Sequence, residues 1–122
     1  MMMKCSLCKG EAVIFLKYNG SHLCDRHFIR FFQKRVNLEF RNELKISKPT
    51  RIGVALSGGK DSSVALFETH RVFSKRPDVS IVAITIDEGI KAYRQETITT
   101  AKSLVKRLGV EHRILKIEDT FG

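Results

Sequence analysis

The sequence predicts an α/β protein, with an incomplete parallel-sheet core that follows a small module rich in cysteine and histidine. Three observations support this fold class. Apolar strands alternate with amphipathic helices from residue 51 onward, a glycine-rich turn follows the first of these strands, and all three cysteines lie within the first 24 residues. Alternation of strand and helix is typical of a parallel sheet with right-handed crossovers.

The first module is expected to cover residues 1–45. Residues 12–18 form an apolar run that predicts a strand, and residues 21–24 predict a short second strand that runs back beside it. Asn19 and Gly20 between them suit a tight hairpin turn, because both residues tolerate positive φ.

A helix is expected over residues 26–44, with Asp25 as its N-cap. One face of this helix is apolar, and it consists of Phe28, Phe31, Phe32, Val36, Phe40 and Leu44. A second face is basic and is either solvated or suited to a phosphate backbone; it consists of Arg26, Arg30, Lys34, Arg41 and Lys45.

The second module is expected to cover residues 51–122, after a polar linker in which Pro49 prevents helix continuation. Its expected elements are strands over 51–56, 80–86 and 110–117 and helices over 61–74 and 93–108. The second strand is almost wholly apolar, as expected for a strand buried on both faces. Gly109 is a natural residue for ending the last helix.

The turn after the first strand of this module is a candidate phosphate loop, Ser57-Gly58-Gly59-Lys60-Asp61-Ser62. Glycines let the backbone wrap closely around a phosphate, and the N–H groups of the loop and helix N-terminus point at the anion. The loop differs from the kinase P-loop, because Val54 stands where that motif requires glycine. Lys60 and Asp61 are the candidate catalytic residues. Asp61 would handle a metal ion or a proton, or simply stabilise the helix N-terminus.

Further candidates follow the second strand, since ligands bind at the carboxyl ends of strands in open α/β sheets. Asp87 could reach ribose or a metal ion, or it could simply belong to a polar loop. Glu88 is interpreted as a loop residue. Tyr93 and Arg94 could bind substrate or pack the following helix.

Cys5-x-x-Cys8 and Cys24-x-x-His27 form two pairs with the spacing of tetrahedral zinc ligands. All three cysteines are used, so the site is closed and a structural role is expected. A module of this size buries too little apolar surface to be stable without such a metal ion. His22 is a rival ligand with poorer spacing, and unlinked buried thiols are the alternative interpretation.

The loop hexapeptide resembles that of the N-type ATP pyrophosphatases. Together with the Cys5–His27 finger and the segment Ile86-Asp87-Glu88-Gly89-Ile90, it is similar to the tRNA 2-thiouridine synthetases of the TtuA type and the cytoplasmic wobble-uridine thiolation enzymes. The resemblance implies an ATP pyrophosphatase core in which Ser57 to Ser62 hold ATP with Mg²⁺. It implies that the backbone around Ile84 to Ile86 contacts adenine. It also implies adenylation of a tRNA uridine, release of pyrophosphate, and displacement of AMP by a sulfur donor protein or sulfide.

One departure concerns the core. Some family members hold an iron–sulfur cluster on core-domain cysteines, but no cysteine follows Cys24 here. Three strands are expected where the family has about five. The chain is therefore interpreted as a truncated or split part of a longer enzyme that self-associates, as a homodimer for example, through an open sheet edge.

Charge and hydropathy narrow the classes of partner. The net charge is +9, and residues 1–50 hold ten Lys and Arg against four Asp and Glu. Such a surface attracts polyanions, of which nucleic acid is the usual one; the alternative interpretation is ordinary charge that keeps the protein in solution. No apolar run approaches the roughly 20 residues that span a bilayer. A cytoplasmic protein without a membrane partner is expected.

Two other functions remain open from the sequence. The first is another adenylating, amidotransferase-like enzyme with the same loop, against which the finger and the basic first module count. The second is a non-catalytic zinc-finger RNA-binding protein with a degenerate loop, against which the intact Lys60, Asp61 and Ser62 count.

Overall fold

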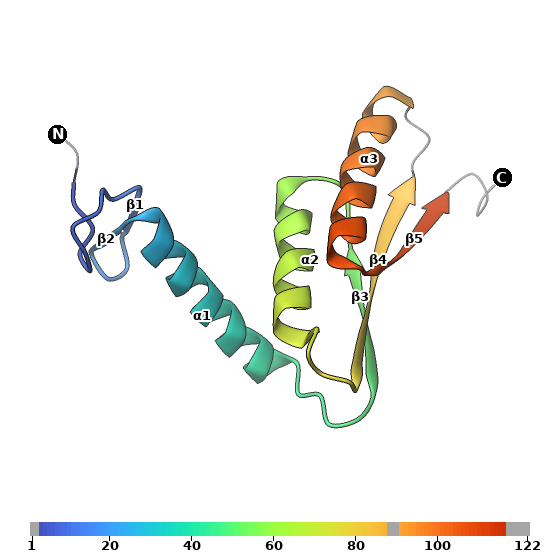
Figure 1. Cartoon of the computed structure of the whole chain (residues 1–122), viewed down its shortest axis with the longest axis horizontal. Helices are drawn as coiled ribbons and strands as arrows, with labels where there is room; N and C mark the ends of the chain where they lie inside the picture. Colours follow the sequence, from blue (N-terminus) through green and yellow to red (C-terminus); the bar gives the residue numbers. More distant parts are fainter. Residues whose placement is uncertain (1–2, 88–90, 117–122) are drawn as a thin grey trace. The chain divides into compact units, whose positions relative to one another are not determined.

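A computed structural model describes residues 3–87 and 91–116, with the side chains of residues 91–95 left out. The chain divides into two compact units, Met1–Lys45 and Ile46–Gly122. Figure 1 shows the elements of both units along the chain. No helix in the described ranges combines the length and the apolar character needed to cross a membrane.

The first unit consists of a hairpin followed by one long helix. Strands β1 (Ile14–Leu16) and β2 (Ser21–Leu23) are antiparallel, and helix α1 covers Asp25–Glu43. The small core of this unit is formed by Leu23 and two cysteines, with partly buried apolar side chains around them; these residues are Cys5, Leu23, Cys24, Ile14, Leu16, Phe28 and Phe31. None of the α1 side chains is fully buried.

Two local predictions for this unit are wrong. The N-cap of α1 is Cys24 rather than Asp25, since the Cys24 sulfur accepts a hydrogen bond from the His27 N–H at 3.5 Å. The hairpin turn is also longer than two residues, because Leu16 pairs directly with Ser21. Only Gly20 of this turn has a positive φ, +71°.

The second unit is a β-α-β-α-β unit, as the sequence predicts. Its elements in order are β3 (Thr50–Ala55), α2 (Lys60–Phe73), β4 (Val79–Asp87), α3 (Lys91–Leu108) and β5 (Glu111–Lys116). The strands form a parallel sheet in the order β3-β4-β5. Among the described residues β3 pairs with β4 alone, so its other edge is unpaired.

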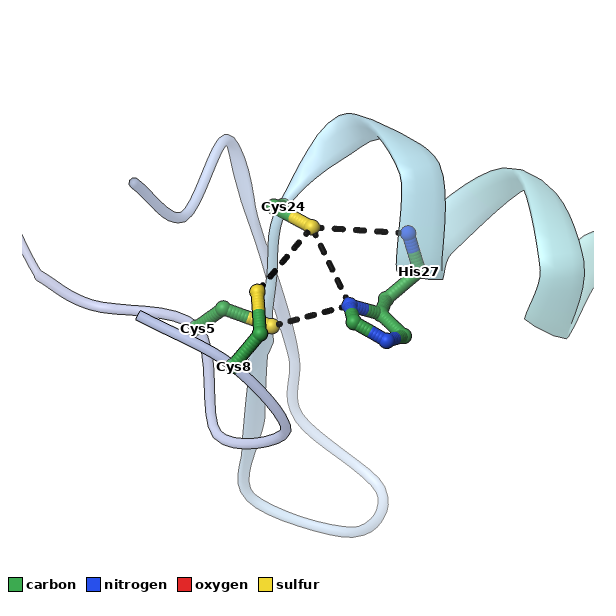
Figure 2. Close-up of side chains that lie close together, drawn as sticks. All are labelled: Cys5, Cys8, Cys24 and His27. Atoms are coloured by element: carbon green, nitrogen blue, oxygen red, sulfur yellow. Dashed lines mark hydrogen bonds between the residues drawn. The ribbon is translucent and has the colours of Figure 1, made fainter. Parts of the chain in front are cut away.

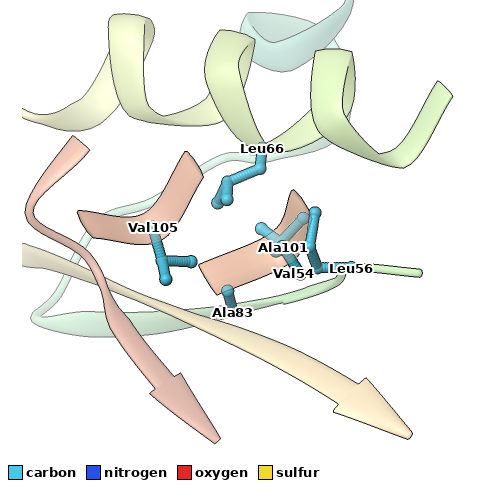
Figure 3. Packing of buried hydrophobic residues seen from close by; sticks show 6 residues of the cluster. All are labelled: Val54, Leu56, Leu66, Ala83, Ala101 and Val105. Carbon is cyan, nitrogen blue, oxygen red and sulfur yellow. The ribbon is translucent and has the colours of Figure 1, made fainter. Parts of the chain in front are cut away.

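Both helices pack on the same face of this sheet (Figure 1). Alternate residues of β3 and β4 point toward them, and Leu66 of α2 is fully buried between the two layers (Figure 3). The core cluster consists of Val54, Leu56, Leu66, Ala83, Ala101 and Val105. On the opposite face, the exposed Glu111 carboxylate pairs with Arg51 at 2.5 Å and with Arg113 at 2.8 Å.

We predict that Leu66→Ala lowers the free energy of unfolding of the second unit by about 2–5 kcal/mol, because it leaves a cavity at a fully buried site. Val64→Ala on the same helix is the control, since the Val64 side chain is exposed, and it should cost less than about 1 kcal/mol. Urea denaturation measures both values. Equal effects would contradict the packing described.

Candidate functional site

The candidate phosphate loop lies at the carboxyl edge of the parallel sheet. It leaves β3 after Ala55 and enters α2 at Lys60, with Gly59 as the N-cap. The N–H groups of the first helical turn have no partner within the helix. This edge is also where open α/β sheets bind their ligands. Strand-loop-helix geometry therefore presents backbone donors at the place where an anion binds.

Two serine hydroxyls close the loop on itself. Ser62 Oγ accepts hydrogen bonds from the Ser57 N–H at 3.0 Å and from Ser57 Oγ at 2.9 Å, and it donates to the Gly59 carbonyl at 3.2 Å. The Gly59 N–H donates to Ser57 Oγ at 3.2 Å. Hydroxyl and amide groups of this kind can donate hydrogen bonds to an anion, and the network holds them close together.

Gly58 is the conformationally demanding residue of the loop. Its φ is +91°, and a Cβ added there would lie 2.3 Å from the carbonyl oxygen of Thr97 in α3. Only glycine combines this φ with so close an approach of two backbones. The loop therefore rests directly on the backbone of α3.

Lys60 and Asp61, the candidate catalytic residues, are both exposed at the start of α2. Neither side chain has an ion-pair partner in the part of the chain that the structure describes. Asp61 lies in the first helical turn and does not cap the helix, since the N-cap is Gly59. Both charged groups are therefore available to a ligand at the loop.

The candidates on β4 lie at the same edge of the sheet. The Leu56 N–H donates to the Ile84 carbonyl at 2.7 Å, so the end of β4 lies beside the start of the loop. Ile86 is 58% exposed, whereas Asp87 is buried. Residues 88–90, which include Glu88, and the side chains of Tyr93 and Arg94 lie outside the described residues.

The predicted metal ligands come together in the first unit. The Cys5, Cys8 and Cys24 sulfurs and a His27 nitrogen all lie within 4.8 Å of one another, and Figure 2 shows the four side chains converging. His22 is not part of this group; its ring packs on Phe15 at 4.7 Å.

The spacing of these atoms fits a tetrahedral metal ion. Two zinc-bound sulfurs lie about 3.8 Å apart, and a zinc-bound sulfur and nitrogen lie about 3.6 Å apart. The distances here are 3.8 Å between the Cys8 and Cys24 sulfurs, and 3.5 Å and 3.2 Å from His27 Nδ1 to the Cys5 and Cys24 sulfurs. A disulfide would need about 2.05 Å. The donor set therefore fits Zn²⁺.

The thiols of the cluster influence one another's ionisation. Burial opposes ionisation of Cys5, but hydrogen bonds from Cys24, Leu7 and Cys8 outweigh it and lower the pKa of the Cys5 thiol to about 6. The Gly10 N–H favours the Cys8 thiolate, yet burial and the neighbouring sulfurs raise the pKa of Cys8 above its usual value. Adjacent thiolates repel, and a bound cation removes this repulsion.

Thr85 and His112 form a polar pair next to the start of the loop, and no sequence pattern indicates that they meet. Thr85 is 2% exposed near the carboxyl end of β4, and its hydroxyl lies 2.7 Å from both the Leu56 carbonyl and His112 Nε2. A threonine in an apolar strand is ordinary, and a histidine in β5 has no spacing relation to it. Burial and the charge of Lys102 lower the pKa of His112.

Comparisons with protein families match both units. Residues 4–29 match the N-terminal LIM domain of the 2-thiouridine synthetase TtuA, and residues 26–121 match the PP-loop domain.

Known proteins resemble the chain along nearly all of its length. The tRNA 2-thiolation protein NcsA of Haloferax volcanii is 35% identical over 98% of this chain, and the tRNA-5-methyluridine(54) 2-sulfurtransferase of Pyrococcus horikoshii is 32% identical over 98%. The chain spans 39% and 37% of these two relatives. The solved U34-tRNA thiolase NcsA of Methanococcus maripaludis, with its [4Fe-4S] cluster, superposes with a TM-score of 0.83 and is 28% identical; the match covers 100% of this chain and 41% of the thiolase.

We predict that Gly58→Ala lowers the free energy of unfolding of the second unit by at least about 2 kcal/mol, because it adds a backbone clash to a strained φ. Gly109→Ala is the matched control. Gly109 has a similar φ of +70° but open space around it, so it should cost only about 1 kcal/mol. Urea denaturation compares the two. A Gly58→Ala cost no larger than that of Gly109→Ala would mean that the loop moves off α3 freely.

Proposed function

We propose a function for this chain from the premise that it belongs to the PP-loop domain family, whose match covers residues 26–121. The chain is the nucleotide-binding N-terminal part of an ATP-dependent tRNA sulfurtransferase that adenylates a uridine for 2-thiolation. The observation that carries the proposal is the Ser57–Ser62 loop. It has every residue of the pyrophosphatase loop that it resembles, and it lies between β3 and α2. The likeness to thiolation enzymes over nearly the whole chain supports the choice of substrate.

ATP is proposed to bind with its pyrophosphate half on the loop. Backbone N–H groups of residues 57–62 and the hydroxyls of Ser57 and Ser62 would hold the phosphate oxygens, and the Lys60 ammonium would offset their charge. The end of β4 lies beside the start of the loop through the Leu56–Ile84 hydrogen bond, and the exposed Ile86 near that end offers a surface for adenosine, whereas the Asp87 side chain is buried.

The proposed reaction starts with attack of a uridine oxygen of tRNA on the α-phosphorus of ATP. Pyrophosphate leaves, and negative charge develops on the oxygen bridging the α and β phosphates. Lys60 and the loop N–H groups are preorganised to stabilise that charge. Mg²⁺, held by the exposed Asp61 carboxylate, would supply Lewis-acid stabilisation when bound. A sulfur donor protein or sulfide would then displace AMP.

The Cys5–His27 cluster is proposed to hold a structural Zn²⁺. Four protein ligands complete a tetrahedral ion and leave no open position for catalysis. The first unit needs this ion because its buried core is one leucine with two of the cysteine ligands. Residues 46–122 contain no cysteine, so the proposal places no iron–sulfur cluster on them.

Transfer RNA is the proposed partner, and the basic face of α1 is a candidate contact for its phosphates. The basic side chains of this face are exposed, and four of the five lie on the helix itself; they are Arg26, Arg30, Lys34, Arg41 and Lys45. Their spacing aligns a row of positive charge that could follow an RNA backbone. The cytoplasmic location and self-association through the open edge of β3 remain predictions from the sequence.

We predict that Lys60→Ala raises the Kd for Mg²⁺-ATP by about 10-fold or more, because the variant loses a charged contact to phosphate. Lys75→Ala is the control, since Lys75 is exposed beyond the other end of α2. Isothermal titration calorimetry measures both values. Unchanged ATP binding by Lys60→Ala would instead favour a non-catalytic RNA-binding protein.

A radiolabelled ATP–pyrophosphate exchange assay tests the acceptor. We expect unmodified tRNA to stimulate exchange and small carboxylic acids to have no effect, because the adenylated group is a uridine oxygen. Stimulation by a small acceptor and not by tRNA would instead favour another adenylating enzyme with the same loop.

We predict that the purified chain holds about one zinc ion and that Cys8→Ser loses it, because three ligands bind the ion far more weakly than four. His22→Gln should retain the zinc, since His22 lies outside the cluster. Inductively coupled plasma mass spectrometry counts the metal, and circular dichroism follows α1. Zinc loss from His22→Gln but not from Cys8→Ser would refute the ligand assignment.

A further inference from the structure

The carbonyl group at the entrance to the phosphate loop is held by a side chain. The last register pair between β3 and β4 is Ala55 with Ile84. One residue later, the Leu56 N–H still reaches the Ile84 carbonyl at 2.7 Å, but the Leu56 carbonyl accepts from Thr85 Oγ1, also at 2.7 Å. Both residues are at most 2% exposed, so water does not compete at this point.

The hydroxyl of Thr85 determines which atom of His112 carries a proton. A threonine hydroxyl has one hydrogen to donate, and here it goes to the Leu56 carbonyl, which can only accept. The second contact of Thr85 Oγ1, 2.7 Å from His112 Nε2, must therefore be donated by the histidine. The result is a chain of hydrogen bonds from His112 through Thr85 to Leu56, in which each bond polarises the next.

The peptide group between Leu56 and Ser57 also forms a hydrogen bond on its N–H side, to a residue of the loop. The Leu56 carbonyl and the Ser57 N–H belong to one planar peptide unit and cannot rotate independently. The Ser57 N–H donates to Ser62 Oγ at 3.0 Å. Thr85 on one side and Ser62 on the other therefore set the orientation of this plane, and with it the direction in which the first N–H of the loop points.

We propose that Thr85 and His112 are positioning residues for the phosphate loop: they fix the Leu56–Ser57 peptide so that the Ser57 N–H and the adjoining hydroxyls face a bound pyrophosphate. The inference rests on the proposed ATP-binding function and extends it to residues that do not touch the ligand. When phosphate draws Ser62 away from Ser57, the Thr85 bond still holds the peptide plane. Without the Thr85 bond, the Leu56–Ser57 peptide can rotate, and part of the binding free energy is lost in ordering it again.

The test compares two buried threonines with the same chemistry. Thr85→Val removes the hydroxyl that holds Leu56, and we expect the Kd for inorganic pyrophosphate with Mg²⁺ to rise about 10-fold. Thr69→Val is the matched control, since Thr69 is buried in α2 and donates to the Ala65 carbonyl at 2.7 Å. It should lower the melting temperature but change Kd less than about twofold. Equal Kd values for the unmodified chain and a folded Thr85→Val variant would overturn the proposal.

A second pair of variants tests the histidine. His112→Leu removes the donor and should raise the same Kd about fivefold, whereas His112→Gln keeps a side-chain N–H and should restore binding to within about twofold. A merely structural role predicts equal losses for both substitutions. Equal losses, or none for His112→Leu, would count against a positioning role.

Nuclear magnetic resonance on the unmodified chain tests the geometry independently of ligand binding. At pH 8 we expect neutral His112 to be protonated at Nε2, and we expect hydrogen exchange at the Ser57 amide to be faster by about 10-fold in Thr85→Val. Protonation at Nδ1 alone, or unchanged exchange, would overturn the inference. Failure of the unmodified chain to bind pyrophosphate would instead refute the proposed function. The His112 protonation state and the Ser57 exchange rate would still test the peptide geometry in that case.

Discussion

The close approach of two backbones at Gly58 is the constraint on which the second unit depends. The chain leaves the sheet after β3, turns with φ of +91°, and comes against the carbonyl of Thr97 before it enters α2. Since any side chain would have to occupy space already held by α3, the loop and that helix form one rigid arrangement. The loop is therefore built on the sheet, α2 and α3 together, which suits a site that must present several N–H groups in fixed directions.

The two units solve the problem of small size in different ways. The second unit buries a continuous apolar layer between one face of its sheet and two helices, with Leu66 at the centre. The first unit has Leu23 as its most buried apolar side chain beside the cysteines, and α1 contributes no fully buried residue. A tetrahedral ion bound by Cys5, Cys8, Cys24 and His27 would replace the missing core, because metal ligation contributes directly to folding. Cys24 would then serve as ligand and helix cap at once.

Several local predictions from sequence failed for reasons that tertiary contacts explain. Asp25 is a good capping residue by propensity. The cluster, however, positions Cys24 so that its sulfur accepts the hydrogen bond from the His27 N–H. The hairpin turn is longer than the Asn19–Gly20 pair alone indicates, because register is set by the pairing of Leu16 with Ser21. Strand and helix ends shifted by a few residues at most, since the apolar pattern places elements well and their ends poorly.

The sequence by itself determined the order of elements, the parallel sheet, the glycine-lysine loop at the end of the first long strand, and the grouping of Cys5, Cys8, Cys24 and His27. Each of these follows from periodicity or spacing within one stretch of chain. Only the tertiary structure decided why Gly58 must be glycine and how His112 reaches the loop through Thr85. Those contacts join residues 27 to 39 positions apart in the chain, and no local pattern encodes a meeting that arises only when strands and helices pack.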